Sequence, residues 1–115
     1  SLANALTKAG YRVEIVDTGE KAIEYLHTES LDLLVSDVEL PAISGYELAR
    51  AVRERYPRLP IILMSATQEQ PRGERTTCFD HFVEKPFHIN EMVELIDKML
   101  LNITQQATAE GNRGN

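Results

Sequence analysis

Hydrophobic positions recur along the chain with two different periods, which predict helices and strands in turn. Four segments have apolar side chains three and four residues apart, as one face of a helix requires. Their apolar positions are Leu2, Leu6 and Ala9; Ala22, Ile23 and Leu26; Leu48, Ala49 and Val52; and Met92, Leu95, Ile96 and Met99. Short apolar runs separate them at residues 11–16, 31–36, 61–65 and 81–84, and predict strands. This alternation is typical of an α/β fold with a parallel sheet and helices on both faces.

Polar residues predict where three of these helices begin. Asp17 with Glu20, and Ser44 with Glu47, have the spacing of a capping box, in which a side chain accepts from the helix's free amides. Asn90 is expected to cap the last helix.

Two polar segments break the pattern. Residues 67–77 (TQEQPRGERTT) contain no apolar side chain and cannot bury a helical face, so a loop or one short turn is expected there. The segment from Asn102 to Asn115 is polar and contains two glycines, which predicts a frayed or disordered tail. The folded domain is therefore expected over residues 1–101, with a polar tail over residues 102–115.

Length, charge and cysteine content narrow the class of protein. A chain of 115 residues makes one domain. With 12 Lys and Arg against 18 Asp and Glu, the net charge of −6 argues against direct nucleic-acid binding. No apolar run approaches the roughly 18 residues of a membrane span, so no membrane insertion is expected. A single cysteine, Cys78, excludes an internal disulfide and fits a reducing cytoplasm.

Three side chains with complementary chemistry follow three of the predicted strands. Asp37 closes the first buried run, Ser65 closes the next, and Lys85 follows the last. Because the carboxyl ends of parallel strands lie at one edge of the sheet, a carboxylate, a hydroxyl and an ammonium group should converge there. This set suits phosphoryl chemistry, with a nucleophile, a hydrogen-bond donor and a cation for phosphoryl oxygens.

The segments that contain these residues resemble the receiver domains of two-component response regulators, the CheY-like family. The matching pieces are SDVELPAISGYEL from Ser36, ILMSA ending at Ala66, and FVEKPF from Phe82, in this order over about residues 1–101. The resemblance implies a flavodoxin-like, doubly wound parallel sheet of strand order 2-1-3-4-5. It also implies a cis peptide bond between Lys85 and Pro86.

The resemblance assigns a role to each site residue. Asp37 would accept a phosphoryl group, Ser65 would be the switch hydroxyl, and Lys85 would contact the phosphoryl oxygens. Phe82 falls at the position of an aromatic switch, although an apolar aromatic residue on a strand is as readily a core residue. Asp37 and the backbone carbonyl of Glu39 would bind Mg²⁺.

The implied function is phosphorylation-driven signalling. A sensor histidine kinase or a histidine phosphotransfer protein would donate the phosphoryl group to Asp37, and the domain would then change conformation. It would promote its own phosphorylation and dephosphorylation to a limited degree, without being an enzyme in the ordinary sense.

The printed sequence lacks two features of the family, a first strand and the acidic pair that ends it and holds Mg²⁺. The family order places that strand between residues 11–16 and 31–36. We therefore expect the natural protein to carry these residues just before Ser1. If the protein lacks that strand, its place in the sheet should be filled by a neighbouring molecule, in a dimer or strand-exchanged assembly, or the sheet should be rearranged.

Two alternative functions remain open at this point. The absent acidic pair and the unusual segment 67–77 favour a pseudo-receiver, an interaction module without phosphoryl chemistry, whereas the intact Asp37, Ser65 and Lys85 count against it. A small phosphatase would use Asp37 as nucleophile and Glu39 as a second acid, but the chain has no additional substrate-binding domain. Mg²⁺-dependent beryllofluoride binding would separate a receiver from a pseudo-receiver.

Overall fold

The computed structural model describes the backbone of residues 1–67 and 70–113, and the side chains as far as Asn102 apart from the gap. It forms two compact units. One is Ile15–Pro86, and the other combines Ser1–Glu14 with the segment from Phe87 onward. Among the described residues, no helix combines the length and hydropathy that a membrane span requires.

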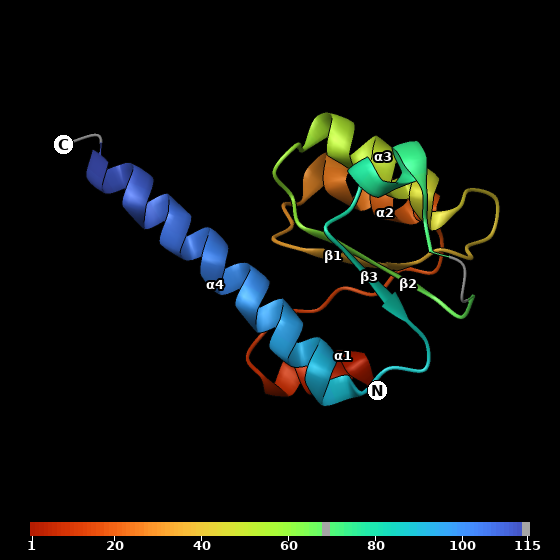
Figure 1. Cartoon of the computed structure of the whole chain (residues 1–115), viewed down its shortest axis with the longest axis horizontal. Helices are drawn as coiled ribbons and strands as arrows, with labels where there is room; N and C mark the ends of the chain where they lie inside the picture. Colours follow the sequence, from red (N-terminus) through yellow and green to blue (C-terminus); the bar gives the residue numbers. More distant parts are fainter. Residues whose placement is uncertain (68–69, 114–115) are drawn as a thin grey trace. The chain divides into compact units, whose positions relative to one another are not determined.

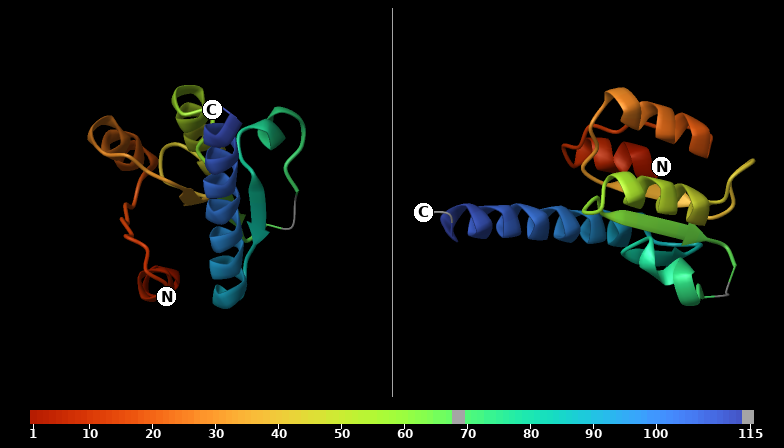
Figure 2. Two further views of the ribbon diagram at one scale, coloured as in Figure 1. Left: turned by 90° about the vertical axis from the view of Figure 1, so that its left-hand side faces the viewer. Right: turned by 90° about the horizontal axis from the view of Figure 1, so that it is seen from above.

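A parallel three-stranded sheet organises the unit Ile15–Pro86. Strands β1 (Leu34–Asp37), β2 (Ile61–Ser65) and β3 (His81–Glu84) lie in the order β1-β2-β3. Helices α2 (Gly19–Thr28) and α3 (Gly45–Arg55), and the 3-10 helix η1 (Gly73–Thr77), follow one another across one face of it (Figures 1 and 2). The predicted α/β class with a parallel sheet is therefore confirmed.

The apolar stripes of α2 and α3 pack on the sheet to form the core of this unit. Ala49, Ile61 and Leu63 have no exposed surface, as expected for the contact between a helix and a central strand. The cluster consists of Ala22, Leu26, Leu48, Ala49, Val52, Leu59, Ile61, Leu63 and Cys78. The helix periodicity of the sequence thus identified the buried face of both helices.

The two predicted capping boxes have different outcomes. The Ser44 hydroxyl accepts a 3.1 Å hydrogen bond from the Glu47 amide at the start of α3, as predicted. At α2 the cap is Thr18, whose Oγ1 accepts from the Lys21 amide, so the prediction of Asp17 as the cap is wrong. Asp17 instead forms a 2.8 Å ion pair with the Lys21 ammonium group one helical turn away.

In the second unit, α1 (Leu2–Lys8) contacts α4 (Ile89–Arg113). Because α4 already includes Asn90, the prediction that this residue caps the helix is wrong. The prediction of a frayed tail is also wrong for the backbone as far as Arg113, which remains helical. Glutamine, alanine and glutamate are good helix formers, and one internal glycine does not stop the helix.

Residues 11–16 are not a strand, contrary to the prediction. Their backbone joins no ladder, and the side chains of Ile15 and Val16 are 74% and 42% exposed. A strand needs a neighbour to satisfy its backbone groups, and within the described residues β1 pairs with β2 alone. The predicted strand over residues 31–36 is shorter than expected and begins at Leu34.

Segment 67–77 forms only the short helix η1 near its end, as predicted, although residues 68–69 lie outside the described part. The bond between Lys85 and Pro86 is cis, also as predicted.

Candidate functional site

The sheet register brings the three predicted site residues to one edge. Asp37 is the last residue of β1, opposite Met64, and Ser65 is the last residue of β2, opposite Glu84. The Lys85 amide continues the ladder by donating to the Ser65 carbonyl at 2.8 Å. Because all three strands run in the same direction, their carboxyl ends bring these residues to the same edge of the sheet.

A lysine–aspartate ion pair lies at the centre of this edge. The Lys85 ammonium group contacts Oδ1 of Asp37, and each side chain is 36% exposed. The Oδ1 atom itself is buried and receives no hydrogen bond of regular geometry from the described residues. The exposure of the Asp37 side chain therefore falls on its atoms other than Oδ1, which include the second carboxylate oxygen.

Ser65 is fully buried, and its hydroxyl is hydrogen-bonded on both sides. It donates to Oε1 of Glu39 at 2.6 Å and accepts from the Thr67 amide at 3.1 Å. The resemblance assigned Glu39 a role through its backbone carbonyl, and only the phosphatase alternative used its carboxylate, so this contact with Ser65 was missed. Glu39 lies beyond the end of β1, where the alternation of side chains along a strand gives no signal for it.

The loop between β1 and α3 is fixed by backbone contacts close to Asp37. The Gly45 amide donates to the Val38 carbonyl at 2.7 Å. A Cβ atom on Gly45 would lie 2.2 Å from the Asp37 carbonyl oxygen and 2.8 Å from the Val38 Cα atom. Only glycine fits at this point, so the first residue of α3 holds the backbone that carries the carboxylate.

Phe82 lies on β3 and is half-buried against the core. Its ring packs against Phe79 with 6.1 Å between centroids, and Phe79 in turn packs against Tyr46 at 6.3 Å. These contacts are ordinary core packing of aromatic rings. A switch role for Phe82 stays a prediction.

Two of the proposed Mg²⁺ ligands are present in the sequence, Asp37 and the backbone carbonyl of Glu39. Mg²⁺ prefers oxygen ligands and is commonly held by one or two carboxylates with several waters. Oδ1 of Asp37 already contacts the Lys85 ammonium group, so this carboxylate lies where it can serve a cation. No group of three or more His, Cys, Asp or Glu side chains in the described part of the chain could hold a metal alone. The two groups therefore suit part of a Mg²⁺ site.

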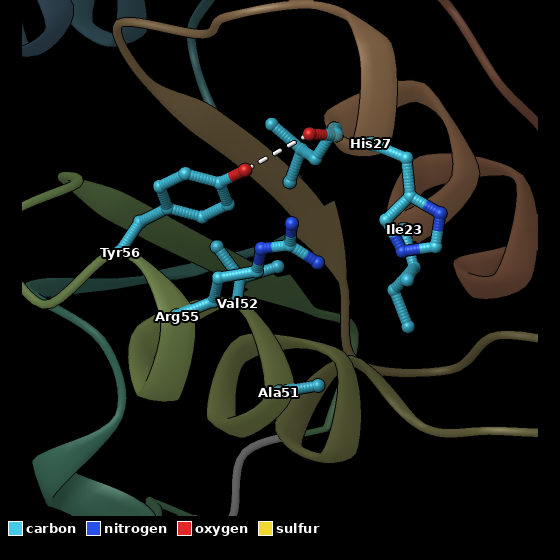
Figure 3. A pocket seen from close by; sticks show the side chains of 7 residues that line it. Ile23, His27, Ala51, Val52, Arg55 and Tyr56 are labelled. Carbon is cyan, nitrogen blue, oxygen red and sulfur yellow. Dashed lines mark hydrogen bonds between the residues drawn. The ribbon is translucent and has the colours of Figure 1, made fainter.

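A small hollow lies between α2 and α3 (Figure 3). At its side the Tyr56 hydroxyl donates a hydrogen bond to the Leu26 carbonyl at 2.9 Å. Its lining residues are Ile23, Leu26, His27, Ala51, Val52, Arg55 and Tyr56. None of the strand-end residues contributes to it, and it belongs to the packing of the two helices.

Comparison with known proteins matches residues 1–97 to the response regulator receiver domain. The response regulator receiver protein CpdR of Brucella abortus is 35% identical over 108 residues, which cover 87% of this chain and 85% of that protein. The DNA-binding transcriptional regulator NtrC of Klebsiella pneumoniae is 32% identical over 108 residues. That match covers 91% of this chain but only 23% of NtrC, so the chain spans about a quarter of that relative.

Solved structures give the same result. The response regulator TrrA of Thermotoga maritima, crystallised in complex with Mg²⁺ and BeF, is similar with a TM-score of 0.78 and 30% identity, over 85% of each chain. The complex of histidine kinase ThkA with TrrA matches with a TM-score of 0.77 and 30% identity, over 86% of this chain and 85% of the matched chain.

Proposed function

This chain belongs to the family of response regulator receiver domains, and on that premise we propose that Asp37 is its phosphoryl acceptor. Receiver domains serve signalling in two-component systems. The observation that supports the assignment is the ion pair between Asp37 and Lys85 at the strand edge, beside the buried Ser65 hydroxyl. These are a nucleophile, a cation and a hydrogen-bond donor within one small site.

Phosphoryl transfer would begin with attack by a carboxylate oxygen of Asp37 on the phosphorus of a phosphohistidine. A P–O bond forms as the P–N bond breaks in line. The electron pair of the P–N bond returns to the imidazole ring, which takes up a proton. The product is an acyl phosphate on Asp37, and attack by water on the phosphorus later restores the carboxylate. In both steps Lys85 offsets the negative charge on the phosphoryl oxygens.

Mg²⁺ is part of this proposal, since the related TrrA was crystallised with Mg²⁺ and BeF. Asp37 and the Glu39 carbonyl would hold the ion. When bound, it would supply positive charge that the transferred phosphoryl group needs. The predicted acidic pair upstream of Ser1 stays a prediction.

The phosphoryl donor would be a histidine kinase or a histidine phosphotransfer protein. TrrA, which is similar to this chain, forms a complex with histidine kinase ThkA. A cytoplasmic location and a dimeric or strand-exchanged assembly stay predictions. DNA binding by NtrC belongs to a protein of which this chain matches 23%, and we do not extend it to this domain.

Switching would follow from the hydroxyl of Ser65. Phosphorylation adds roughly −1.5 to −2 charge and new acceptor oxygens at the end of β1. Donation by Ser65 to one of these oxygens would draw in the loop after β2, and inward rotation of the Phe82 ring would accompany it. The change is a shift between two forms that already exist.

The test is phosphate labelling of the natural chain that contains these residues, with a phosphohistidine donor. The Asp37→Asn variant should lose acid-stable, alkali-labile labelling and keep its fold, as judged by circular dichroism. Asp32→Asn is the matched control, because Asp32 is exposed and precedes β1. Undiminished labelling of Asp37→Asn at another residue would refute the assignment.

A further inference from the structure

We propose that the Glu39 carboxylate is a latch on Ser65, which holds the switch hydroxyl in the unphosphorylated protein and releases it on phosphorylation. The inference rests on the proposed function of Asp37. It goes beyond that function because Glu39 would act as a positioning residue through its side chain, separately from its backbone carbonyl.

The geometry of the hydroxyl is the first argument. A serine hydroxyl has one proton to donate. Ser65 donates it to Oε1 of Glu39 at 2.6 Å, a short distance typical of a bond to a charged acceptor. The Thr67 amide, from the loop after β2, donates to the hydroxyl oxygen of Ser65 at 3.1 Å. Ser65 therefore cannot donate to a phosphoryl group until its hydrogen bond to Glu39 breaks.

Burial is the second argument. Ser65 has no exposed surface, so water cannot readily replace a lost partner, and an unsatisfied buried hydroxyl is costly. The Glu39 residue itself is exposed, and its carboxylate can turn away into solvent. The hydroxyl thus needs one acceptor at all times, and exchange of Glu39 for a phosphoryl oxygen meets that need.

Charge is the third argument. In the unphosphorylated site, the Lys85 ammonium group pairs with Asp37 and offsets its charge. A phosphoryl group on Asp37 adds negative charge two residues before Glu39. Repulsion between the two anions opposes the bond from Ser65 to Glu39 at the moment when a new acceptor appears. The latch would therefore keep the resting form populated and open in response to phosphorylation.

The test compares Glu39→Ala and Glu39→Gln with the control Glu54→Ala, an exposed glutamate on α3. Beryllofluoride affinity is measured by titration at saturating Mg²⁺, in the wild-type and the Ser65→Ala background. Removal of the competing acceptor in Glu39→Ala should tighten binding about three- to tenfold, the range for one hydrogen bond. In the Ser65→Ala background the same substitution should change affinity by less than about twofold.

A second measurement needs no phosphoryl analogue. Without ligand, Glu39→Ala should shift the Ser65 and Thr67 amide resonances toward their positions in the beryllofluoride-bound wild type. Glu39→Gln should shift them less, since its amide oxygen can still accept from the hydroxyl. Glu54→Ala should not shift them.

The outcomes of these measurements separate failure of the Glu39 latch from failure of the proposed function of Asp37. If the wild type binds beryllofluoride but Glu39→Ala has the same effect with and without the Ser65 hydroxyl, Glu39 acts by charge alone and the latch is wrong. If the ligand-free amides of Glu39→Ala match those of Glu54→Ala, the latch is also wrong. If the wild type binds no beryllofluoride, or Asp37→Asn binds it equally well, the proposed function fails first.

Discussion

At the scale of single residues, the absence of a side chain at Gly45 allows the close backbone contacts that hold Asp37 in place. Gly45 opens α3, and its Cα approaches the Asp37 carbonyl so closely that a Cβ atom would lie 2.2 Å from that oxygen. The amide of the same glycine donates a hydrogen bond to the Val38 carbonyl at 2.7 Å. Placement of the Asp37 carboxylate therefore depends on a residue that has no side chain.

Replacement of Gly45 by alanine should destabilise the protein by about 1–3 kcal/mol, because rigid backbone must move to relieve the overlap. Denaturant-induced unfolding measures the change in the free energy of unfolding. Gly19→Ala is the matched control, since Gly19 opens α2. There the new methyl group would meet the end of the flexible Ile43 side chain at 2.5 Å. Equal losses in the two variants would contradict the backbone argument.

The convergence of the three proposed site residues could be predicted from the sequence because each lies at the end of an apolar run. Asp37, Ser65 and Lys85 lie where parallel topology brings strand ends together, so their proximity needed no knowledge of side-chain rotamers. The hydrogen bond from Ser65 to Glu39 could not be predicted in the same way. It depends on where a long, exposed side chain turns, which the hydrophobic pattern does not encode.

At the scale of elements, one tyrosine joins the segment after α1 to α4. The Tyr11 hydroxyl donates a hydrogen bond to Oδ1 of Asp97. This bond, with some desolvation and the charge of Asp97, raises the pKa of Tyr11 above its ordinary value. Because the folded pKa is raised, the stabilisation is complete below the unfolded pKa of about 10 and is lost as the pH rises through the folded value.

Above about pH 10, the protection factors of amides in α1 and in the first turns of α4, which correct for base-catalysed intrinsic exchange, should therefore fall. Tyr11→Phe should have lower protection factors already at neutral pH, and these should not fall further in the alkaline range. Tyr25→Phe is the control, because that tyrosine lies on α2 in the other unit. An unchanged alkaline dependence in Tyr11→Phe would show that another group is responsible.

Elements with a strong period were predicted more successfully than elements that depend on a neighbour. The apolar stripes of α2 and α3 identify the faces that are buried. Residues 11–16 have an equally clear strand pattern, yet Ile15 remains 74% exposed, because a strand also requires a paired backbone. Helix ends were less predictable, since Thr18 and Asp17 are both good caps and only the backbone conformation decides between them.

At the scale of the molecule, the site collects residues from three strands that are distant in sequence. A ligand on Asp37 that also touches Ser65 and Lys85 would act on the ends of β1, β2 and β3 together. The alternation of strands and helices was enough to predict this convergence, since parallel strands must be connected by crossovers and must end at one edge. Phosphorylation should therefore be sensed across the whole sheet of the unit Ile15–Pro86.

Lys85→Ala tests this coupling. In the resting protein the lysine contacts Asp37, and both side chains are 36% exposed, so loss of the pair should cost less than about 1 kcal/mol of stability. The proposed contact between Lys85 and a phosphoryl group would be a charge-assisted hydrogen bond. Loss of this contact should weaken beryllofluoride binding about tenfold or more. Mg²⁺ affinity measured without beryllofluoride should not fall, because in the proposed site the lysine would contact the phosphoryl group and not the metal.

Lys21→Ala is the control with the same change of net charge, since Lys21 is an exposed residue of α2 that pairs with Asp17. At saturating ligand, the wild type and Lys21→Ala should show amide shifts at the ends of all three strands. Lys85→Ala should keep the shifts at β1 and β2 and lose those at β3, because Lys85 is the side chain through which β3 reaches the ligand. Equal affinities and equal β3 shifts in the two lysine variants would mean that Lys85 acts only through its pair with Asp37 in the resting state.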